Sequence, residues 1–126
     1  MADSTANILC IDDDPDVLFA LDTFLHEMGY DVRTAPCAED GLAAYNTQRA
    51  DLVLVDLMME DIDSGLQLVQ TIRDMGDAPP IIMLSSVGDQ MFREVPASNY
   101  GLDGVLQKPV DKDRLISLLE AKLQQA

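Results

Sequence analysis

The sequence predicts an α/β fold in which a doubly wound, five-stranded parallel sheet is covered by helices on both faces. Five short apolar runs recur along the chain, and segments with helical periodicity separate them. Three of these runs, ILCI, LVLV and IIML, are continuous rather than alternating, which is typical of strands buried on both faces. Strands that alternate with helices imply right-handed crossovers between parallel strands. The strands are predicted at residues 8–11, 30–34, 52–55, 81–84 and 105–106.

The first helix, predicted at residues 15–28, has the clearest boundary signals. Asp14 can cap the free backbone N–H groups, Pro15 suits the first helical position, and Gly29 follows the last turn. An apolar stripe at helical spacing is expected to pack on the sheet. It consists of Val17, Leu18, Leu21, Phe24, Leu25 and Met28.

Three more helices are predicted from the same periodicity, at residues 38–48, at residues 65–75 and after Lys108 and Pro109. The segment 88–100 is expected to form only a short or irregular helix, because Pro96 interrupts it. The inward-facing residues of the three helices are expected to be Leu42 and Tyr45, then Leu66, Leu68, Val69 and Ile72, then Leu115, Leu118, Leu119 and Leu123.

Length and charge restrict the class of protein. The 126 residues correspond to one domain, 1–126, with 8 Lys plus Arg against 23 Asp plus Glu and a net charge of −15. A field of this sign argues against direct binding to nucleic acid or to anionic membranes. No apolar run approaches the ~20 residues of a membrane span, and no secretory signal is present, so a cytoplasmic protein is expected. Its two cysteines, Cys10 and Cys37, are expected to be reduced.

Polar residues follow the strands at the edge where ligands bind in such sheets, outside the carboxyl ends of the strands. Carboxylates gathered there repel one another, and a hard divalent cation lowers that cost. Mg²⁺ fits best, because it takes oxygen ligands while it binds phosphate oxygens. The residues at the strand ends are Asp12, Asp13 and Asp14, then Asp56, then Ser85 and Ser86, then Gln107 and Lys108.

Three of these positions suggest phosphoryl chemistry. Asp56 could act as a nucleophile toward phosphorus, Lys108 could pair with Asp56 and with phosphoryl oxygens, and Ser85 could reach such an oxygen. Taken singly, each has a simpler interpretation. Asp56 could cap the next turn, Lys108 could be a surface lysine, and Ser85 could be a turn residue. The combination with Asp12 and Asp13 favours the chemical interpretation.

Four segments, ILCIDDDPDV, LVLVDLMM, IIMLSS and LDGVLQKPV, together resemble the receiver domain of two-component response regulators over essentially the whole chain. The similarity is to single receivers of the chemotaxis type. It implies a flavodoxin-like three-layer sandwich with the strand order 2-1-3-4-5.

The resemblance also implies roles for individual residues. Asp12, Asp13, Asp56 and the backbone carbonyl of Met58 would bind Mg²⁺. Asp56 would accept a phosphoryl group from a histidine kinase or a histidine phosphotransfer protein. Ser85 and Lys108 would then bias a rearrangement of the face formed by helix four, strand five and helix five, which a downstream output protein or domain reads. Such a domain is no enzyme beyond self-phosphorylation from phosphodonors and slow self-dephosphorylation.

Three departures from the family pattern are visible. Glu60 stands where the family usually has Pro, and Gly65 arrives nine residues after Asp56 instead of eight, so the loop is one residue longer. Val105 replaces the switch aromatic of strand five, and Pro96 interrupts helix four.

Other functions remain open from the sequence alone. The departures leave a phosphorylation-independent pseudo-receiver as an alternative. Asp12, Asp14, Ser85 and Lys108 imitate a phosphatase of the haloacid dehalogenase type, but in this chain no acidic pair follows a later strand, as that class requires. A flavin-binding electron carrier would need hydroxyls and glycine after the first strand, where this chain has acids.

Overall fold

The computed structural model describes residues 6–56, 62–85, 102–108 and 110–123. Five strands form one parallel sheet in the order β2-β1-β3-β4-β5, which confirms the expected topology. The strands are β1 (Asn7–Ile11), β2 (Asp31–Ala35), β3 (Leu52–Asp56), β4 (Ile81–Ser85) and β5 (Gly104–Gln107). The helices are α1 (Pro15–Glu27), α2 (Ala38–Thr47), α3 (Ile62–Asp74) and α5 (Lys112–Leu123).

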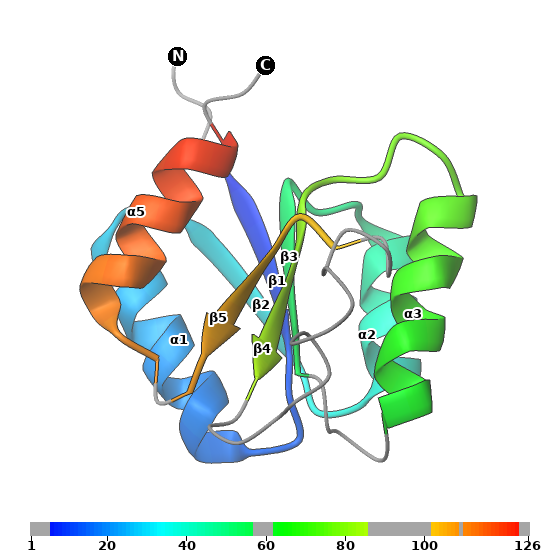
Figure 1. The fold of residues 1–126 in the computed structure, drawn as a ribbon, viewed down its shortest axis with the longest axis horizontal. Coiled ribbons are helices and arrows are strands. Elements are labelled where there is room, and N and C mark those ends of the chain that lie inside the picture. Colours follow the sequence, from blue (N-terminus) through cyan, green and yellow to red (C-terminus); the bar gives the residue numbers. More distant parts are fainter. Residues whose placement is uncertain (1–5, 57–61, 86–101, 109, 124–126) are drawn as a thin grey trace, which may run out of the picture.

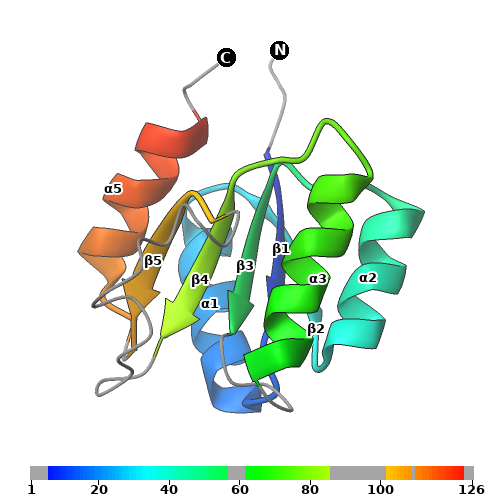
Figure 2. The same cartoon turned by 45° about the vertical axis from the view of Figure 1, so that its right-hand side comes forward.

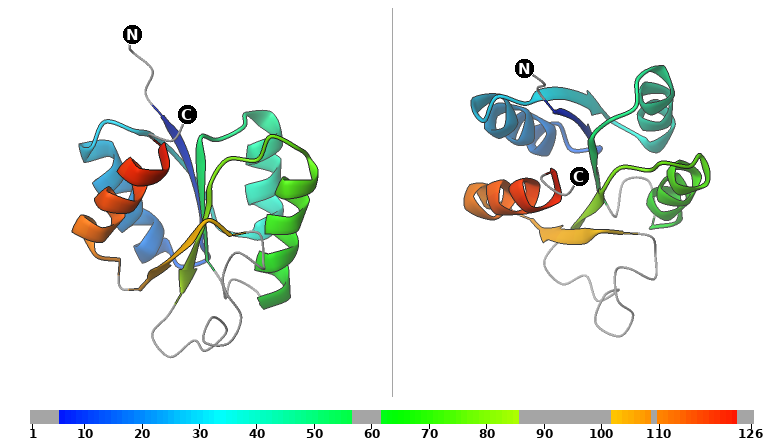
Figure 3. Two further views of the ribbon diagram at one scale, coloured as in Figure 1. Left: turned by 45° about the horizontal axis from the view of Figure 1, so that its top comes forward. Right: turned by 90° about the horizontal axis from the view of Figure 1, so that it is seen from above.

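The molecule has three layers, with α1 and α5 on one face of the sheet and α2 and α3 on the other (Figures 1, 2 and 3). Every residue of β1, β3 and β4 is buried, as the continuous apolar runs predict. Successive side chains of a strand point to opposite faces, so each strand supplies both cores. In β1, Ile8 and Cys10 join the core under α1 and α5, whereas Leu9 and Ile11 join the core under α2 and α3.

The helices pack through the predicted stripes. Leu21 and Leu25 of α1 are buried, as are Leu115 and Leu119 of α5, and the other members of those two stripes are partly buried against the same core. Asp14 caps α1, since its side chain accepts the N–H of Asp16. None of the helices in these described ranges is long and apolar enough to cross a bilayer.

The bounds of one helix and one strand differ from those predicted. The prediction that α3 begins at Gly65 is wrong, because the helix begins at Ile62. Its first turn contains Asp63 and Ser64, residue types common at helix starts, but the apolar stripe that located the helix begins only at Leu66. Strand β2 is shifted by one residue from the prediction. The predicted irregular segment 88–100 lies outside the described residues.

Helix α2 approaches the sheet closely at Gly41, which is buried. A Cβ atom built on Gly41 would lie 2.5 Å from Cδ1 and 2.9 Å from Cγ1 of Ile11. Ile11 is fully buried in β1 and directly precedes Asp12. The absence of a side chain at Gly41 therefore sets the distance between α2 and the strand that leads into the acidic edge.

Replacing Gly41 by Ala is expected to lower the free energy of unfolding by about 1–3 kcal/mol. Overpacking against Ile11 outweighs the gain in helix propensity, which is about 1 kcal/mol. Urea unfolding measures the change. Adding Ile11→Val removes the nearest methyl group, so the double variant should lose less than the sum of the two single losses. A Gly41→Ala protein as stable as the original would show that this contact is not tight.

Candidate metal and phosphoacceptor site

The structure brings Asp12 and Asp56 together at the carboxyl edge of the sheet. In the parallel pairing of β1 with β3, Ile11 is opposite Val55, so the next residues along both strands are neighbours. The Asp12 N–H continues the ladder by donating to the carbonyl of Ala35 in β2 at 3.1 Å. Asp12 is fully buried and Asp56 is only 4% exposed. Adjacent, paired strands thus hold both carboxylates side by side in a buried position.

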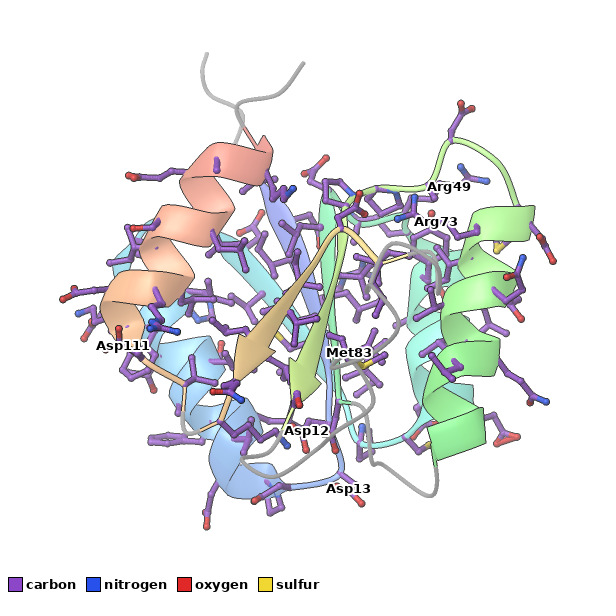
Figure 4. All side chains as sticks on the ribbon, viewed as in Figure 1. Asp12, Asp13, Arg49, Arg73, Met83 and Asp111 are labelled. Atoms are coloured by element: carbon purple, nitrogen blue, oxygen red, sulfur yellow. The ribbon has the colours of Figure 1, made fainter. Side chains whose placement is uncertain are left out.

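Asp13 completes the acidic group from the start of the loop into α1 (Figure 4). Unlike Asp12, it is exposed to solvent. One carboxylate oxygen from each of Asp12, Asp13 and Asp56 can be chosen so that all three lie within 4.8 Å of one another. Oxygen atoms grouped in this way are suitable ligands for a hard divalent cation.

Lys108 directly follows β5 and supplies positive charge to the same carboxyl edge of the sheet. Its position is fixed by the backbone, because its N–H donates to the carbonyl of Ser85 at 2.7 Å, at the end of the β4–β5 pairing. Its Nζ lies 2.8 Å from Oδ2 of Asp12 and 3.0 Å from Oδ1 of Asp56. The pairing with Asp56 was expected from the sequence, whereas the contact with Asp12 was not. Only the adjacency of β1 and β3 reveals that contact.

The electrostatics of Asp12 and Lys108 follow from this arrangement. Burial raises the pKa of Asp12, and the negative charge of Asp56 adds to the effect, although Lys108 and the N–H of Asp14 oppose it. Burial lowers the pKa of Lys108, but its hydrogen bonds to Asp12 and Asp56 and their charges outweigh burial and raise that pKa overall. The lysine therefore stays protonated as the counter-charge of the cluster.

The two carboxylate oxygens of Asp12 have different neighbours. Its Oδ1 accepts the N–H of Asp14 at 2.9 Å. Its Oδ2 is buried beside the Lys108 ammonium, whose Nζ lies 2.8 Å away. A buried carboxylate oxygen in that state carries a large desolvation cost. The residues present therefore fit a Mg²⁺ ion.

The other predicted site residues are placed in part. Ser85 ends β4 and is 3% exposed. The pairing of Asp56 with Leu84 puts Ser85 one residue further along the same edge. Val105 is half-buried in β5. Met58 lies outside the described residues.

Comparison with known proteins identifies the family. The family model described as the response regulator receiver domain matches residues 8–120. This chain belongs to the response regulator receiver domain family. Receiver domains are signalling domains of two-component systems, and they bind Mg²⁺ at an acidic pocket such as the one formed here by the three aspartates. The match does not favour the phosphatase or flavin-carrier alternatives.

Individual relatives of this receiver domain agree with the assignment. The chain is 36% identical over 126 residues to the transcriptional regulatory protein GlrR of Escherichia coli (strain K12), covering 100% of this chain and 28% of GlrR. The structure of the receiver domain of NtrX from Brucella abortus matches with 31% identity and a TM-score of 0.84, covering 94% of this chain and 99% of that one.

A second solved structure, chemotaxis response regulator CheY4 of Vibrio cholerae, matches with 25% identity and a TM-score of 0.83, covering 95% of this chain and 100% of that one. Among curated relatives, the regulatory protein PhoP of Bacillus subtilis (strain 168) is 29% identical over 119 residues, which are 94% of this chain and 49% of PhoP. The receiver thus spans half or less of the two curated relatives.

In this receiver, Asp12→Asn is expected to raise the free energy of unfolding by about 1 kcal/mol when a chelator removes divalent metal. The raised pKa of Asp12 means that the ionised form of its carboxyl group is less stable in the folded protein than in the unfolded chain. This cost is present above the raised pKa and disappears as the pH falls through it. Mg²⁺ should then stabilise the original protein more than the variant. Urea unfolding at neutral pH, with chelator and with Mg²⁺, measures both effects.

The matched control for this substitution is Asp13→Asn. Its carboxylate is exposed, so water screens the repulsion and the gain in chelator should be smaller. A loss of stability in the Asp12→Asn protein under chelator would contradict the electrostatic description of the site.

Proposed function

We propose that residues 1–126 form one receiver domain that accepts a phosphoryl group on Asp56 from a histidine kinase or a histidine phosphotransfer protein. The residues that would hold a Mg²⁺ ion there are Asp12, Asp13, Asp56 and, through its backbone carbonyl, Met58. The observation that carries this proposal is the cluster of three carboxylates within 4.8 Å, two of them contacted by Lys108. No other cluster of three metal-ligating side chains occurs within the described ranges.

Each residue of the site has a distinct task in the transfer. An oxygen of Asp56 forms the new bond to phosphorus while the bond from phosphorus to the donor's imidazole nitrogen breaks. A bound Mg²⁺ ion would neutralise the negative charge on the phosphoryl oxygens. Lys108, already in contact with Asp56, offers an ammonium to those oxygens as their charge grows. Asp12 and Asp13 would hold the metal and take no part in bond formation.

The consequences of phosphorylation are read on the face that includes β5 and α5. Ser85 and Lys108 lie at the ends of β4 and β5, so movement of either residue toward a phosphoryl group acts directly on these strands. Helix four of the family pattern falls in the segment outside the described residues. Because Val105 replaces the switch aromatic, the response cannot depend on an aromatic rotamer at this position.

Partners and location belong to the same proposal. Relatives named as transcriptional regulators support an output protein or domain downstream of this receiver. The net charge of −15 supports the absence of direct contacts with nucleic acid or membrane by this domain. Both features agree with a cytoplasmic signalling protein.

Phosphorylation should depend on Asp56 alone. Incubation with Mg²⁺ and a small phosphodonor such as acetyl phosphate should add one phosphoryl group to the intact mass, and Asp56→Asn should abolish the addition. Asp74→Asn is the matched control, because Asp74 is exposed at the end of α3 and accepts a hydrogen bond from Gln70 of the same helix. A chelator should suppress the reaction. An unmodified original protein would instead favour the phosphorylation-independent pseudo-receiver.

Self-dephosphorylation should be slow, with Met58→Asn accelerating it severalfold. The positions two residues after Asp56 and two after Ser85 are Met58 and Val87. Apolar side chains there offer no hydrogen bonds to orient the hydrolytic water, whereas an asparagine amide does. Decay of the Asp56 phosphoryl group, followed by intact mass after removal of the donor, measures the rate. An unchanged or slower decay in Met58→Asn would count against this explanation.

A further inference from the structure

The start of β5 is attached to the start of β4 by one residue, Asp103. Its Oδ2 accepts the N–H of Ile81 at 2.8 Å, and its own N–H donates to the Ile81 carbonyl at 2.7 Å. Both polar backbone groups of Ile81, which is fully buried, are thus bonded to Asp103. Pro79 and Pro80 precede Ile81 and have no N–H to donate. Asp103 therefore closes the β4–β5 pair at its amino end.

Packing specifies the register of β5 only weakly. The strand has four residues, of which only Leu106 is buried, and Gly104 at its start carries no side chain. A slip of one residue would place Leu102 or Gly104 beside Ile81. Neither side chain offers an acceptor, so the N–H of Ile81 would lose this hydrogen bond in a buried position, which is costly. The carboxylate of Asp103 therefore favours the observed register of the β4–β5 pair.

The register of β5 determines where the Lys108 ammonium lies. Lys108 directly follows the strand, its N–H donates to the Ser85 carbonyl at 2.7 Å, and its Nζ lies 3.0 Å from Oδ1 of Asp56. A slip of one residue moves a side chain by about 3.3 Å along the strand and turns it to the opposite face. Lys108 would then not reach Asp56. The amino end of β5 thus controls the position of a charged group at its carboxyl end.

Arg73 fixes the orientation of the Asp103 carboxylate. Its Nη2 lies 2.5 Å from Oδ2 of Asp103, the same oxygen that accepts the N–H of Ile81. Arg73 belongs to the last turn of α3, at the end of the molecule opposite Asp12 (Figure 4). An ionised acceptor makes a shorter and stronger hydrogen bond than a neutral one. Helix α3 therefore supports the attachment of β5 to β4.

A second aspartate makes the same pair of hydrogen bonds at the start of β3. Oδ2 of Asp51 accepts the N–H of Asn7 at 2.7 Å, and the Asp51 N–H donates to the Asn7 carbonyl, also at 2.7 Å. Asp51 and Asp103 each directly precede a strand, and those strands, β3 and β5, lead to Asp56 and Lys108. The recurrence supports a role in setting the register of strands that carry site residues.

We propose that Asp103 is a positioning residue for phosphoryl transfer to Asp56 and acts through Lys108. It holds β5 in the register that keeps the Lys108 ammonium beside Asp56, where the phosphoryl oxygens arrive. This inference rests on the proposed function and extends the requirements of the site to the opposite edge of the sheet.

A double-mutant cycle of Asp103→Ala and Lys108→Met tests this role. The measured quantity is the rate of Asp56 phosphorylation at saturating acetyl phosphate and Mg²⁺, followed by intact mass. Asp103→Ala should lower this rate about tenfold, because misplacing a reacting group by an ångström or more is costly. Asp103→Asn keeps an acceptor for the N–H of Ile81 and should stay within about threefold of the original rate. In the Lys108→Met background, Asp103→Ala should cost less than about twofold, since both substitutions remove the same effect.

The matched control is Asp74→Ala, which removes an exposed carboxylate that accepts from Gln70 at the end of α3. Its rate should equal that of the original protein. An unchanged rate in Asp103→Ala would overturn the proposal. A loss as large in the Lys108→Met background as in the original protein would also overturn it, because Asp103 would then act independently of the lysine.

Urea unfolding establishes whether each variant is folded under the assay conditions. If Asp103→Ala is not, Arg73→Met takes its place in the cycle, because it leaves the Asp103 carboxylate in the chain. Its loss of rate should likewise vanish in the Lys108→Met background, and an unchanged rate or an undiminished loss would overturn the proposal. If the original protein takes up no phosphoryl group, the proposed function fails, whereas phosphorylation with additive losses refutes the role of Asp103 alone.

Discussion

The repulsion between Asp12 and Asp56 is the constraint on which this receiver domain depends. Both follow strands whose residues are all buried, and the pairing of β1 with β3 holds them side by side. Neither carboxylate can relax toward water, because Asp12 is fully buried and Asp56 nearly so. The fold must therefore place positive charge at this edge, from a lysine, a metal ion or both.

The distribution of the other cations reinforces this dependence. Arg33 donates to the carbonyls of Ala44 and Gln48 at the end of α2, and Arg49 donates to those of Met75 and Gly76 after α3. Basic side chains at helix C-termini satisfy free carbonyls and complement the helix dipole. Arg49 and Arg73 lie at the end of the molecule opposite Asp12 and Asp13 (Figure 4). These arginines stabilise the far end of the fold, whereas the Lys108 ammonium neutralises the carboxylates at the acidic edge.

The sequence predicts the strands well because β1, β3 and β4 are short runs that are apolar on both faces, which is typical of strands in a parallel sheet covered by helices. It predicts the site residues through their position after those strands. It does not predict the start of α3, since the polar first turn carries no apolar stripe. It also does not show that Asp12 is buried whereas Asp13 is exposed. That difference arises because the Asp12 N–H extends the hydrogen bonding between β1 and β2 to the carbonyl of Ala35. The contact of Lys108 with Asp12 depends on the strand order, which periodicity cannot supply.

The carboxylates of Asp12, Asp13 and Asp56 are proposed to form one divalent cation site. Crystals of the protein soaked with Mn²⁺, which suits the same oxygen ligands as Mg²⁺ and can be located by anomalous scattering, test this most directly. We predict one strong anomalous peak per chain, within about 2.5 Å of an oxygen of Asp12 and of Asp56. A strong peak elsewhere on the protein, with none between these two carboxylates, would show that they do not form the cation site.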